Sequence, residues 1–315
     1  MKQPRRRFGI GEWYGKSFLA MTPAERRRLA TLQIAKDPKL KTIVCPFRST
    51  PVAIVPCTKP GGVCSLRLYE EVADKITPVE GPIGQLRATC PNRFQQETIV
   101  YDWVSEIVLR SRSAAVISEI GFLQRPSSED DTEKKEDNVG RIDEVLLIPG
   151  SDPLRWCALE VQAVYFSGPG MSSEFKNISS SKGPRIPFPI AIRRPDYRSS
   201  GPKRLMPQLQ IKVPTLRRWG KKMAVVVDRS FFWALGKMED VKDISNADVA
   251  WFVVGYDEMS TPIRLIRDFV CFTTLERAVE GLTGGVPVTL VEFERRIMEK
   301  AARLEAPSLT KPDLV

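Results

Sequence analysis

Residues 141–148, RIDEVLLI, and residues 156–166, WCALEVQAVYF, are two apolar stretches separated by a short turn. Stretches of this length and composition predict two β-strands, and the short turn lets them pair as a hairpin-like unit. Asp143 lies in the first stretch, and Glu160 and Gln162 lie in the second. Because side chains alternate between the faces of a strand, Glu160 and Gln162 share one face, and strand pairing brings Asp143 to Glu160.

These side chains are a candidate catalytic centre for phosphodiester hydrolysis. Two carboxylates hold Mg²⁺, a cation that prefers oxygen ligands, lowers the pKa of a bound water and offsets charge on phosphorus. A third polar group orients the attacking water; it is usually a lysine, and here Gln162 has that position. Since glutamine cannot act as a base, deprotonation would depend on the metal-bound water and its neighbours.

The alternative interpretation is that these carboxylates are solvated residues at a strand edge, which is common. Glu160, however, lies between Leu159 and Val161 in a strand that is otherwise apolar. Such a strand is buried on both faces, and a buried carboxylate needs a partner or a metal ion. The local sequence therefore favours a functional role.

Composition narrows the chemistry further. The chain has 315 residues, a formal net charge of +10 and a pI near 9.4, which favours polyanionic partners such as DNA or RNA. It contains no histidine, which excludes Ser-His-Asp and Cys-His catalysis and zinc sites with histidine ligands. We find no apolar run long enough to span a membrane and no secretory signal, so we expect a cytoplasmic protein.

The rest of the chain predicts a mixed α/β (α+β) fold, in which helices flank a mixed central sheet. Residues 21–36 predict a helix with a capping box from Thr22 and Glu25, and residues 94–118 predict an amphipathic helix. Further helices are expected over residues 209–222, 231–238 (capped by Ser230) and 291–304, and strands over residues 224–228 and 250–256. Loops are expected over residues 125–140 and 167–208, and loops with short strands over residues 41–93.

Four cysteines lie in the first third of the chain: Cys45, Cys57, Cys64 and Cys90. Neighbouring prolines and the Gly61-Gly62 pair suit tight turns that aim thiolates inward. Four thiolates suit Zn²⁺ or iron in a closed structural site, and four free thiols are the alternative. Cys157 and Cys271 lie apart and are expected in the core.

Several short segments resemble one family of enzymes. CPF (residues 45–47), GVC (62–64) and CPNR (90–93) resemble the cysteine-rich segment of the NotI-like type II restriction endonucleases. LEVQ (159–162) is similar to that family's E-x-Q version of the nuclease motif, and Asp143 falls where its metal-binding aspartate falls. The order of the motifs also agrees, from about residue 40 to about residue 240.

The resemblance implies a PD-(D/E)XK endonuclease core over residues 94–315, preceded by an N-terminal helix and a four-cysteine metal-binding domain over residues 1–93. It implies that Asp143 and Glu160 bind catalytic Mg²⁺, that Gln162 replaces the motif's lysine and that Glu119 assists. It also implies that the four cysteines named above hold a structural iron ion. Thiolates bind Zn²⁺ as well as iron, so the site suits either metal.

The same resemblance implies a homodimer that cuts double-stranded DNA at a GC-rich palindrome and leaves 5′ overhangs. A bacterial cell with such an enzyme needs a cognate DNA methyltransferase to protect its own sites, as in a restriction-modification system. Arginine is the residue that most often reads guanine. The candidates for DNA contact are Arg185, Arg193, Arg194, Arg198, Arg204, Arg217 and Arg218.

Two other functions compete with this interpretation. One is a non-catalytic DNA-binding regulator with a four-cysteine metal site, against which the set of Asp143, Glu160 and Gln162 argues. The other is a structure-specific repair or junction nuclease, against which the cysteine cluster argues.

Overall fold

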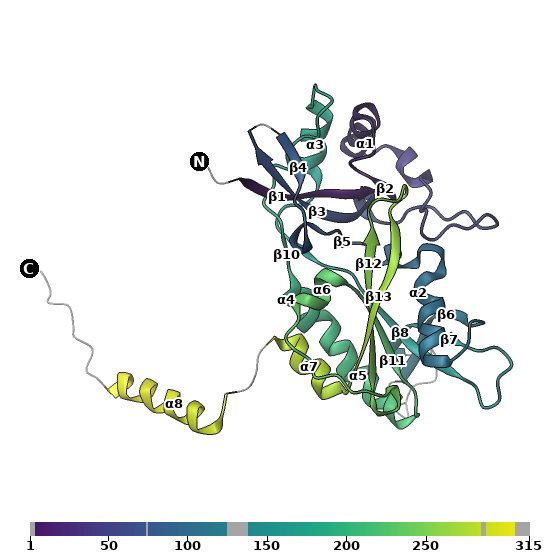
Figure 1. Cartoon of the computed structure of the whole chain (residues 1–315), viewed down its shortest axis with the longest axis vertical. Helices are drawn as coiled ribbons and strands as arrows, with labels where there is room; N and C mark the ends of the chain where they lie inside the picture. The colour runs from purple at the N-terminus through teal and green to yellow at the C-terminus, as the bar shows by residue number, and fades with distance from the viewer. Residues whose placement is uncertain (1–3, 74, 125–137, 285–287, 306–315) are drawn as a thin grey trace, which may run out of the picture.

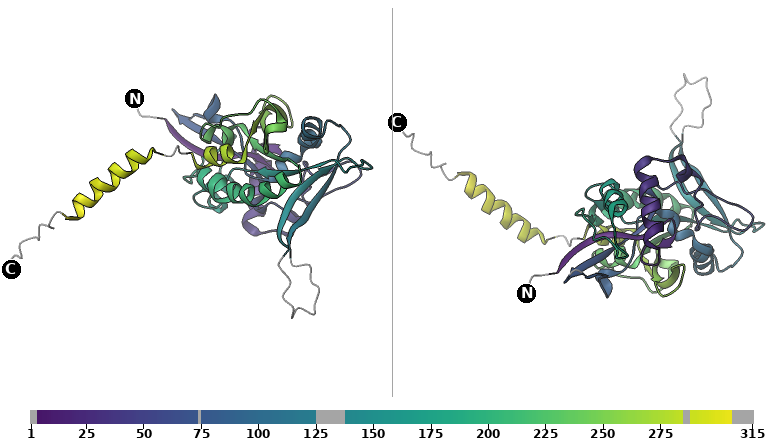
Figure 2. Two further views of the ribbon diagram at one scale, coloured as in Figure 1. Left: turned by 90° about the horizontal axis from the view of Figure 1, so that it is seen from below. Right: turned by 90° about the horizontal axis from the view of Figure 1, so that it is seen from above.

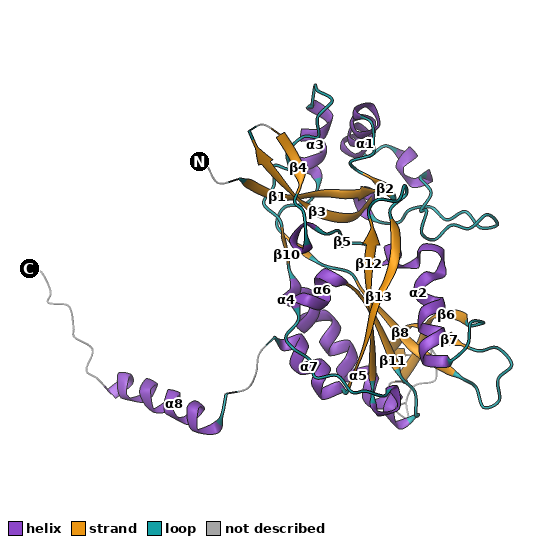
Figure 3. Cartoon of the chain, viewed as in Figure 1, coloured by secondary structure: helices purple, strands orange, loops and turns teal. Residues whose placement is uncertain are grey.

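The computed structural model describes residues 4–73, 75–124, 138–284 and 288–305. Within these ranges the chain forms two main β-sheets with helices packed against them (Figures 1 and 3). No helix in the described ranges is long and apolar enough to cross a membrane.

A six-stranded mixed sheet forms the larger part of the molecule, with strand order β13-β12-β11-β8-β7-β6 (Figure 1). Its strands are β6 (Ala115–Gln124), β7 (Asn138–Leu147), β8 (Trp156–Gln162), β11 (Met223–Asp228), β12 (Val249–Asp257) and β13 (Arg264–Thr273). Strand β11 runs parallel to β8 and β12, and the other pairs are antiparallel. The mixed α/β class is therefore confirmed, and β7 and β8 pair as expected.

Helices cover both faces of this sheet. Val225 of β11 faces a core cluster that includes α5 (Met206–Arg218), while its neighbour Val226 faces a second cluster that includes α2 (Ile99–Val104). Because both faces are covered, β11 is apolar along almost its whole length. Two further helices contribute to the first cluster: α6 (Arg229–Ala234) and α7 (Leu275–Thr283).

A second sheet has the strand order β2-β1-β3-β4, with β5 paired to β3. Its strands are β1 (Arg5–Trp13), β2 (Lys16–Ser17), β3 (Val63–Val72), β4 (Lys75–Pro78) and β5 (Arg87–Ala88). Helices α1 (Pro23–Ala35) and α3 (Ser172–Ser180) pack beside it, and the rings of Trp13 and Phe175 stack with centroids 5.3 Å apart. Helix α3, from the middle of the chain, thus forms part of the apolar core beside the N-terminal sheet.

Buried polar contacts join the two sheets. The Nε of Arg93 lies 2.9 Å from Oε2 of Glu12 in β1, and both side chains are fully buried. Arg93 also donates to the carbonyl of Ile263, just before β13, at 3.1 Å. Asp228, at the end of β11, accepts the backbone N–H of Ala88 in β5 at 3.0 Å. The position of one sheet is therefore fixed against the other by charge and hydrogen bonding.

Several sequence predictions are confirmed. Helix α1 begins with the expected capping box, in which Thr22 and Glu25 exchange hydrogen bonds. Strands β7, β11 and β12 and helix α5 lie close to the expected ranges, and α8 (Leu290–Glu305) matches the expected C-terminal helix.

Other expectations about the fold are wrong. The single helix over residues 94–118 is instead a 3-10 segment (Pro91–Thr98), α2, a π-helical turn (Ser105–Leu109) and the start of β6. Glu97 and Thr98 have left-handed backbone conformations, with φ of 52° and 56°, which interrupt the helix. The apolar pattern indicated a helix correctly only for α2, which packs against the sheet.

The stretch 167–208 also contains more regular structure than expected. Its elements are α3, the end of β9 (Phe166–Ser167), β10 (Arg194–Pro195), α4 (Tyr197–Ser200), a π-helical turn (Gly201–Leu205) and the start of α5. Its serines and prolines masked α3, whose Phe175 and Ile178 are buried against the N-terminal sheet.

Smaller differences concern the ends, caps and lengths of elements. Strand β8 ends at Gln162 and the chain pairs again only in β9, whereas one strand to residue 166 was expected. Asp228, not Ser230, caps α6, because its carboxylate accepts the N–H of Phe231 at 2.8 Å. Strand β3 is longer than the short strands expected over residues 41–93. Residues 125–137 of the expected loop lie outside the described residues, and residues 138–140 already belong to β7.

Replacing Arg93 by alanine is expected to lower the free energy of unfolding by roughly 3–5 kcal/mol, because it leaves the Glu12 carboxylate buried and unpaired. Arg112→Ala is the control, since Arg112 pairs with Glu106 at the surface and its loss should cost about 1 kcal/mol or less. Urea denaturation measures both changes. Equal small losses for the two variants would show that the Glu12–Arg93 pair does not hold the sheets together.

Candidate active site

Strands β7 and β8 bring the two predicted carboxylates together. Their antiparallel register pairs Glu144 with Leu159 and Val145 with Ala158. One further step along this register places Asp143 opposite Glu160. The side chain of Glu160 is only 9% exposed, whereas that of Asp143 is 61% exposed. The pair therefore has one carboxylate inside the sheet and one facing solvent.

Lys212 of α5 contacts both carboxylates. Its Nζ lies 2.8 Å from Oε2 of Glu160 and 3.3 Å from Oδ1 of Asp143, and its side chain is 2% exposed. Sequence reasoning missed this residue and considered only the basic residues that end the helix. A signal was present, because Lys212 interrupts an apolar stripe formed by Leu209 and Leu216 on the buried face of α5.

The electrostatics of the site follow from burial. Burial raises the pKa of the Glu160 carboxyl to about 7. The nearby charge of Lys212 lowers that pKa, and the charge of Asp143 raises it, but burial has the largest effect. When Glu160 is ionised, two carboxylates face one ammonium, and the net negative charge favours a further cation that prefers oxygen ligands.

Gln162 lies two residues beyond Glu160, at the end of β8. In the pairing of β8 with β11, Glu160 and Gln162 lie beside Val225 and Val227, which both face the α5 side of the sheet. The Nε2 of Gln162 donates to the neighbouring carbonyl of Ala163 at 2.6 Å. Gln162 thus lies on the same face of β8 as Glu160, and its amide is hydrogen-bonded to the adjacent backbone.

Glu119 lies in β6, the strand next to β7. The register on either side of it, Ser118 with Glu144 and Ile120 with Ile142, places its backbone across from Asp143. Its φ of 58° is left-handed, and its side chain is 75% exposed and 3.5 Å from a nitrogen of Arg141. The structure therefore places Glu119 at the rim of the carboxylate pair, on the solvent side.

The arginines expected at DNA occupy different environments. Arg193 is buried and donates to Glu174 at 2.8 Å and to two backbone carbonyls. Arg217 forms ion pairs with two acidic residues. Arg204 is exposed and lies over the ring of Tyr165, 4.6 Å from its centroid. The other four side chains are exposed: Arg185, Arg194, Arg198 and Arg218.

The four N-terminal cysteines gather in one region beside the second sheet. Cys45, Cys57 and Cys64 belong to one buried cluster, and the N–H of Cys90 donates to the carbonyl of Cys64 at 3.2 Å. Burial is the main cause that raises the pKa of the Cys57, Cys64 and Cys90 thiols. Even so, the described residues contain no group of three or more cysteine or acidic side chains arranged to hold a metal ion.

The two remaining cysteines lie elsewhere. Cys157 is fully buried in the α2 side of the central core, as expected, and Cys271 of β13 is partly buried against the other side.

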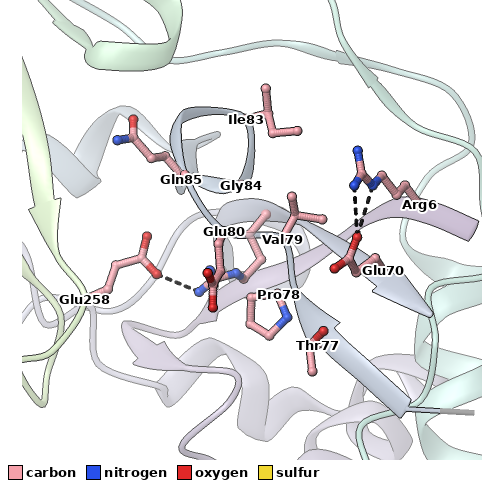
Figure 4. A pocket seen from close by; sticks show the side chains of 12 residues that line it. Arg6, Glu70, Thr77, Pro78, Val79, Glu80, Ile83, Gly84, Gln85 and Glu258 are labelled. Atoms are coloured by element: carbon pink, nitrogen blue, oxygen red, sulfur yellow. Dashed lines mark hydrogen bonds and ion pairs between the residues drawn. The ribbon is translucent and has the colours of Figure 1, made fainter. Parts of the chain in front are cut away.

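A pocket of about 770 Å³ lies on the N-terminal sheet (Figure 4). Its arginines are already paired: Arg67 lies 2.7 Å from Glu258, and Arg6 lies 3.1 Å from Glu70. Neither Asp143 nor Glu160 lines it. This pocket is therefore separate from the carboxylate pair.

Comparison with known proteins gives one family match. A family model described as restriction endonuclease NotI matches residues 29–264 of the chain. This range contains both carboxylates, Lys212 and all four clustered cysteines. A search among curated proteins gives no match.

Proposed function

This chain belongs to the NotI restriction endonuclease family, and on that premise we propose that it cleaves double-stranded DNA at the Asp143–Glu160 pair with Mg²⁺. Membership makes the chain a site-specific deoxyribonuclease. The two competing functions, a non-catalytic regulator and a repair nuclease, are therefore set aside.

The observation that carries the proposal is the convergence of Asp143 and Glu160 on one cationic group, the ammonium of Lys212. Two acids on adjacent strands of a mixed sheet, the second of them the glutamate of the E-x-Q sequence, support a PD-(D/E)XK core over residues 94–315. We assign residues 1–93 to an N-terminal unit that carries the cysteines and against which α3 packs.

Each polar residue of the site has its own role in the proposed hydrolysis. Asp143 and Glu160 would hold Mg²⁺, which supplies a water of lowered pKa and positive charge against the phosphate. Glu160 is fixed by burial and by Lys212, while exposed Asp143 faces the side from which DNA approaches. Gln162 takes the place of the motif's lysine along the strand, where its neutral amide orients water without accepting its proton. Glu119 assists from the solvent side.

Recognition and cellular role follow from the family. We propose a GC-rich palindromic site, cleavage that leaves 5′ overhangs, and a cognate methyltransferase in the bacterial cytoplasm that protects the host's own sites. The exposed arginines Arg185, Arg194, Arg198 and Arg218, together with Arg204, are the candidates for contact with guanine or phosphate. Arg193 is left out of this set because its guanidinium is buried against Glu174, and Arg217 is left out because it forms ion pairs with Asp248 and Glu276.

A palindrome is matched by a two-fold protein, so we propose that the active form is a homodimer. Helix α8 supports this, since it stands apart from both sheets (Figures 1 and 2). It exposes five large apolar side chains: Leu290, Val291, Phe293, Ile297 and Met298. An isolated helix of this length is marginal in water, so a second copy of the chain would stabilise it by covering this face.

We also propose that Cys45, Cys57, Cys64 and Cys90 bind a structural iron or zinc ion. The support is their gathering from separate segments into one region and the affinity of thiolates for these metals. The thiols do not form a coordination shell as they stand, and the metal has no part in the hydrolysis proposed above.

Replacing Asp143 by asparagine should lower the cleavage rate at least about 100-fold, because one ligand of the cation that stabilises transition-state charge is lost. Binding to the cognate DNA in EDTA should stay within about threefold of wild type. Glu299→Gln, which removes an exposed carboxylate on the side of α8 away from its apolar face, is the matched control and should cut normally. Normal cleavage by Asp143→Asn would remove the carboxylate pair from the mechanism.

The double variant Phe293→Asp/Ile297→Asp should convert the dimer into a single chain of 35.5 kDa, because it places charge on the apolar face of α8. Light scattering measures the mass, with Glu299→Gln, on the opposite side of α8, as the dimeric control. A monomeric wild type, or a double variant that stays dimeric, would contradict the role of α8.

Replacing Cys57 by serine should release the structural metal and lower stability, since such binding is coupled to folding. Elemental analysis of the purified protein gives the metal per chain. Cys271→Ser, outside the cluster, should keep full metal content. A folded Cys57→Ser variant with unchanged metal would show that the four-cysteine assignment is wrong.

A further inference from the structure

The E-x-Q sequence leaves the catalytic strand without a cationic side chain. The amide of Gln162 is neutral, and its Nε2 is engaged with the carbonyl of Ala163 at 2.6 Å. The cationic group that the structure places at the carboxylates comes instead from α5, where Nζ of Lys212 lies within 3.3 Å of both Asp143 and Glu160.

Burial of Lys212 has a cost that stability does not explain. The side chain is 2% exposed and occupies the stripe by which α5 packs on the sheet, between Leu209 and Leu216. Moving an ammonium and a carboxylate out of water costs several kcal/mol per ion, and a well-packed apolar pair in their place is often as stable or more stable. A lysine held at this depth therefore indicates a function beyond packing.

The geometry of the ammonium leaves a donor available. A lysine ammonium has three N–H donors, and Glu160 and Asp143 accept one each. Asp143 is 61% exposed, so the side of the site away from Glu160 is open to solvent and to a DNA backbone. The ammonium itself is almost fully buried, so a phosphate oxygen would have to approach its third N–H past Asp143, on the exposed side of the site.

We propose that Lys212 is the catalytic lysine of this nuclease, supplied by α5 in place of the lysine that β8 lacks, and that it contacts the scissile phosphate directly. In the hydrolysis, the oxygen of water bonds to phosphorus, one P–O ester bond breaks, and the departing oxygen gains a proton. Lys212 donates to a non-bridging oxygen whose negative charge grows during this step. This inference rests on the proposed function and assigns a further residue to the same site.

The test compares Lys212→Met with wild type in single-turnover cleavage across a range of Mg²⁺ concentrations. Lys221→Met is the control, because Lys221 follows α5 but donates to the carbonyl of Leu154, away from the site. We expect Lys212→Met to cut about 100-fold or more slowly at saturating Mg²⁺, with DNA binding in EDTA within about threefold of wild type. The control should cut normally.

Two outcomes overturn the inference. A rate within threefold of wild type shows that Lys212 is not needed. A rate restored to the wild-type value by high Mg²⁺ shows that Lys212 only positions the carboxylates for the metal.

If Lys212→Met fails to fold, the same cleavage measurement on Lys212→Arg tests whether Lys212 contacts the phosphate. Arginine keeps the charge beside Glu160 but presents its donors on a planar fork, so a fall of tenfold or more with normal DNA binding supports direct contact. A wild-type rate for Lys212→Arg overturns it.

Failure of the underlying function gives a different result. If wild type does not cut in Mg²⁺, or Asp143→Asn cuts as well as wild type, the nuclease site itself is wrong, and the inference about Lys212 is overturned with it.

Discussion

A carboxylate buried in the middle of a sheet, that of Glu160, is the constraint on which the functional architecture depends. Its strand is covered on both faces, so water does not solvate the charge. The ammonium of Lys212, from α5, forms an ion pair with Glu160. The same ammonium also contacts Asp143, on the neighbouring strand β7. The proposed binding of Mg²⁺ depends on the net negative charge that these three groups carry when Glu160 is ionised.

The second sheet is tied to this core by other buried charges. Arg93 links Glu12 of β1 to the carbonyl before β13, and Asp228 links the end of β11 to β5. Asp228 also caps α6, so the end of a central strand, a helix and the second sheet share one carboxylate. The cysteine region therefore has a fixed position relative to the catalytic strands.

Much of the site was predictable because it is local in sequence. Period-2 alternation and a short turn were enough to pair β7 with β8 and to place Asp143 opposite Glu160. Lys212 was not found because it lies 52 residues beyond Glu160, and only packing of α5 on the sheet brings it there. Helix α3 was missed for a similar reason: its serine-rich sequence is weakly helical, and burial of Phe175 against Trp13 stabilises it. The prediction of one helix over residues 94–118 was wrong because Glu97 and Thr98 have left-handed backbone conformations that interrupt it. Nothing in these two residue types signals such a conformation.

The central claim is that the Asp143–Glu160–Lys212 site makes this chain a metal-dependent, site-specific nuclease. The most direct measurement is digestion of a GC-rich phage genome by the purified wild-type protein, in Mg²⁺ and in EDTA. We predict discrete fragments in Mg²⁺ alone, whose sequenced ends share one palindrome. Discrete fragments that form equally in EDTA, or intact DNA across several GC-rich substrates despite normal binding, would contradict the account.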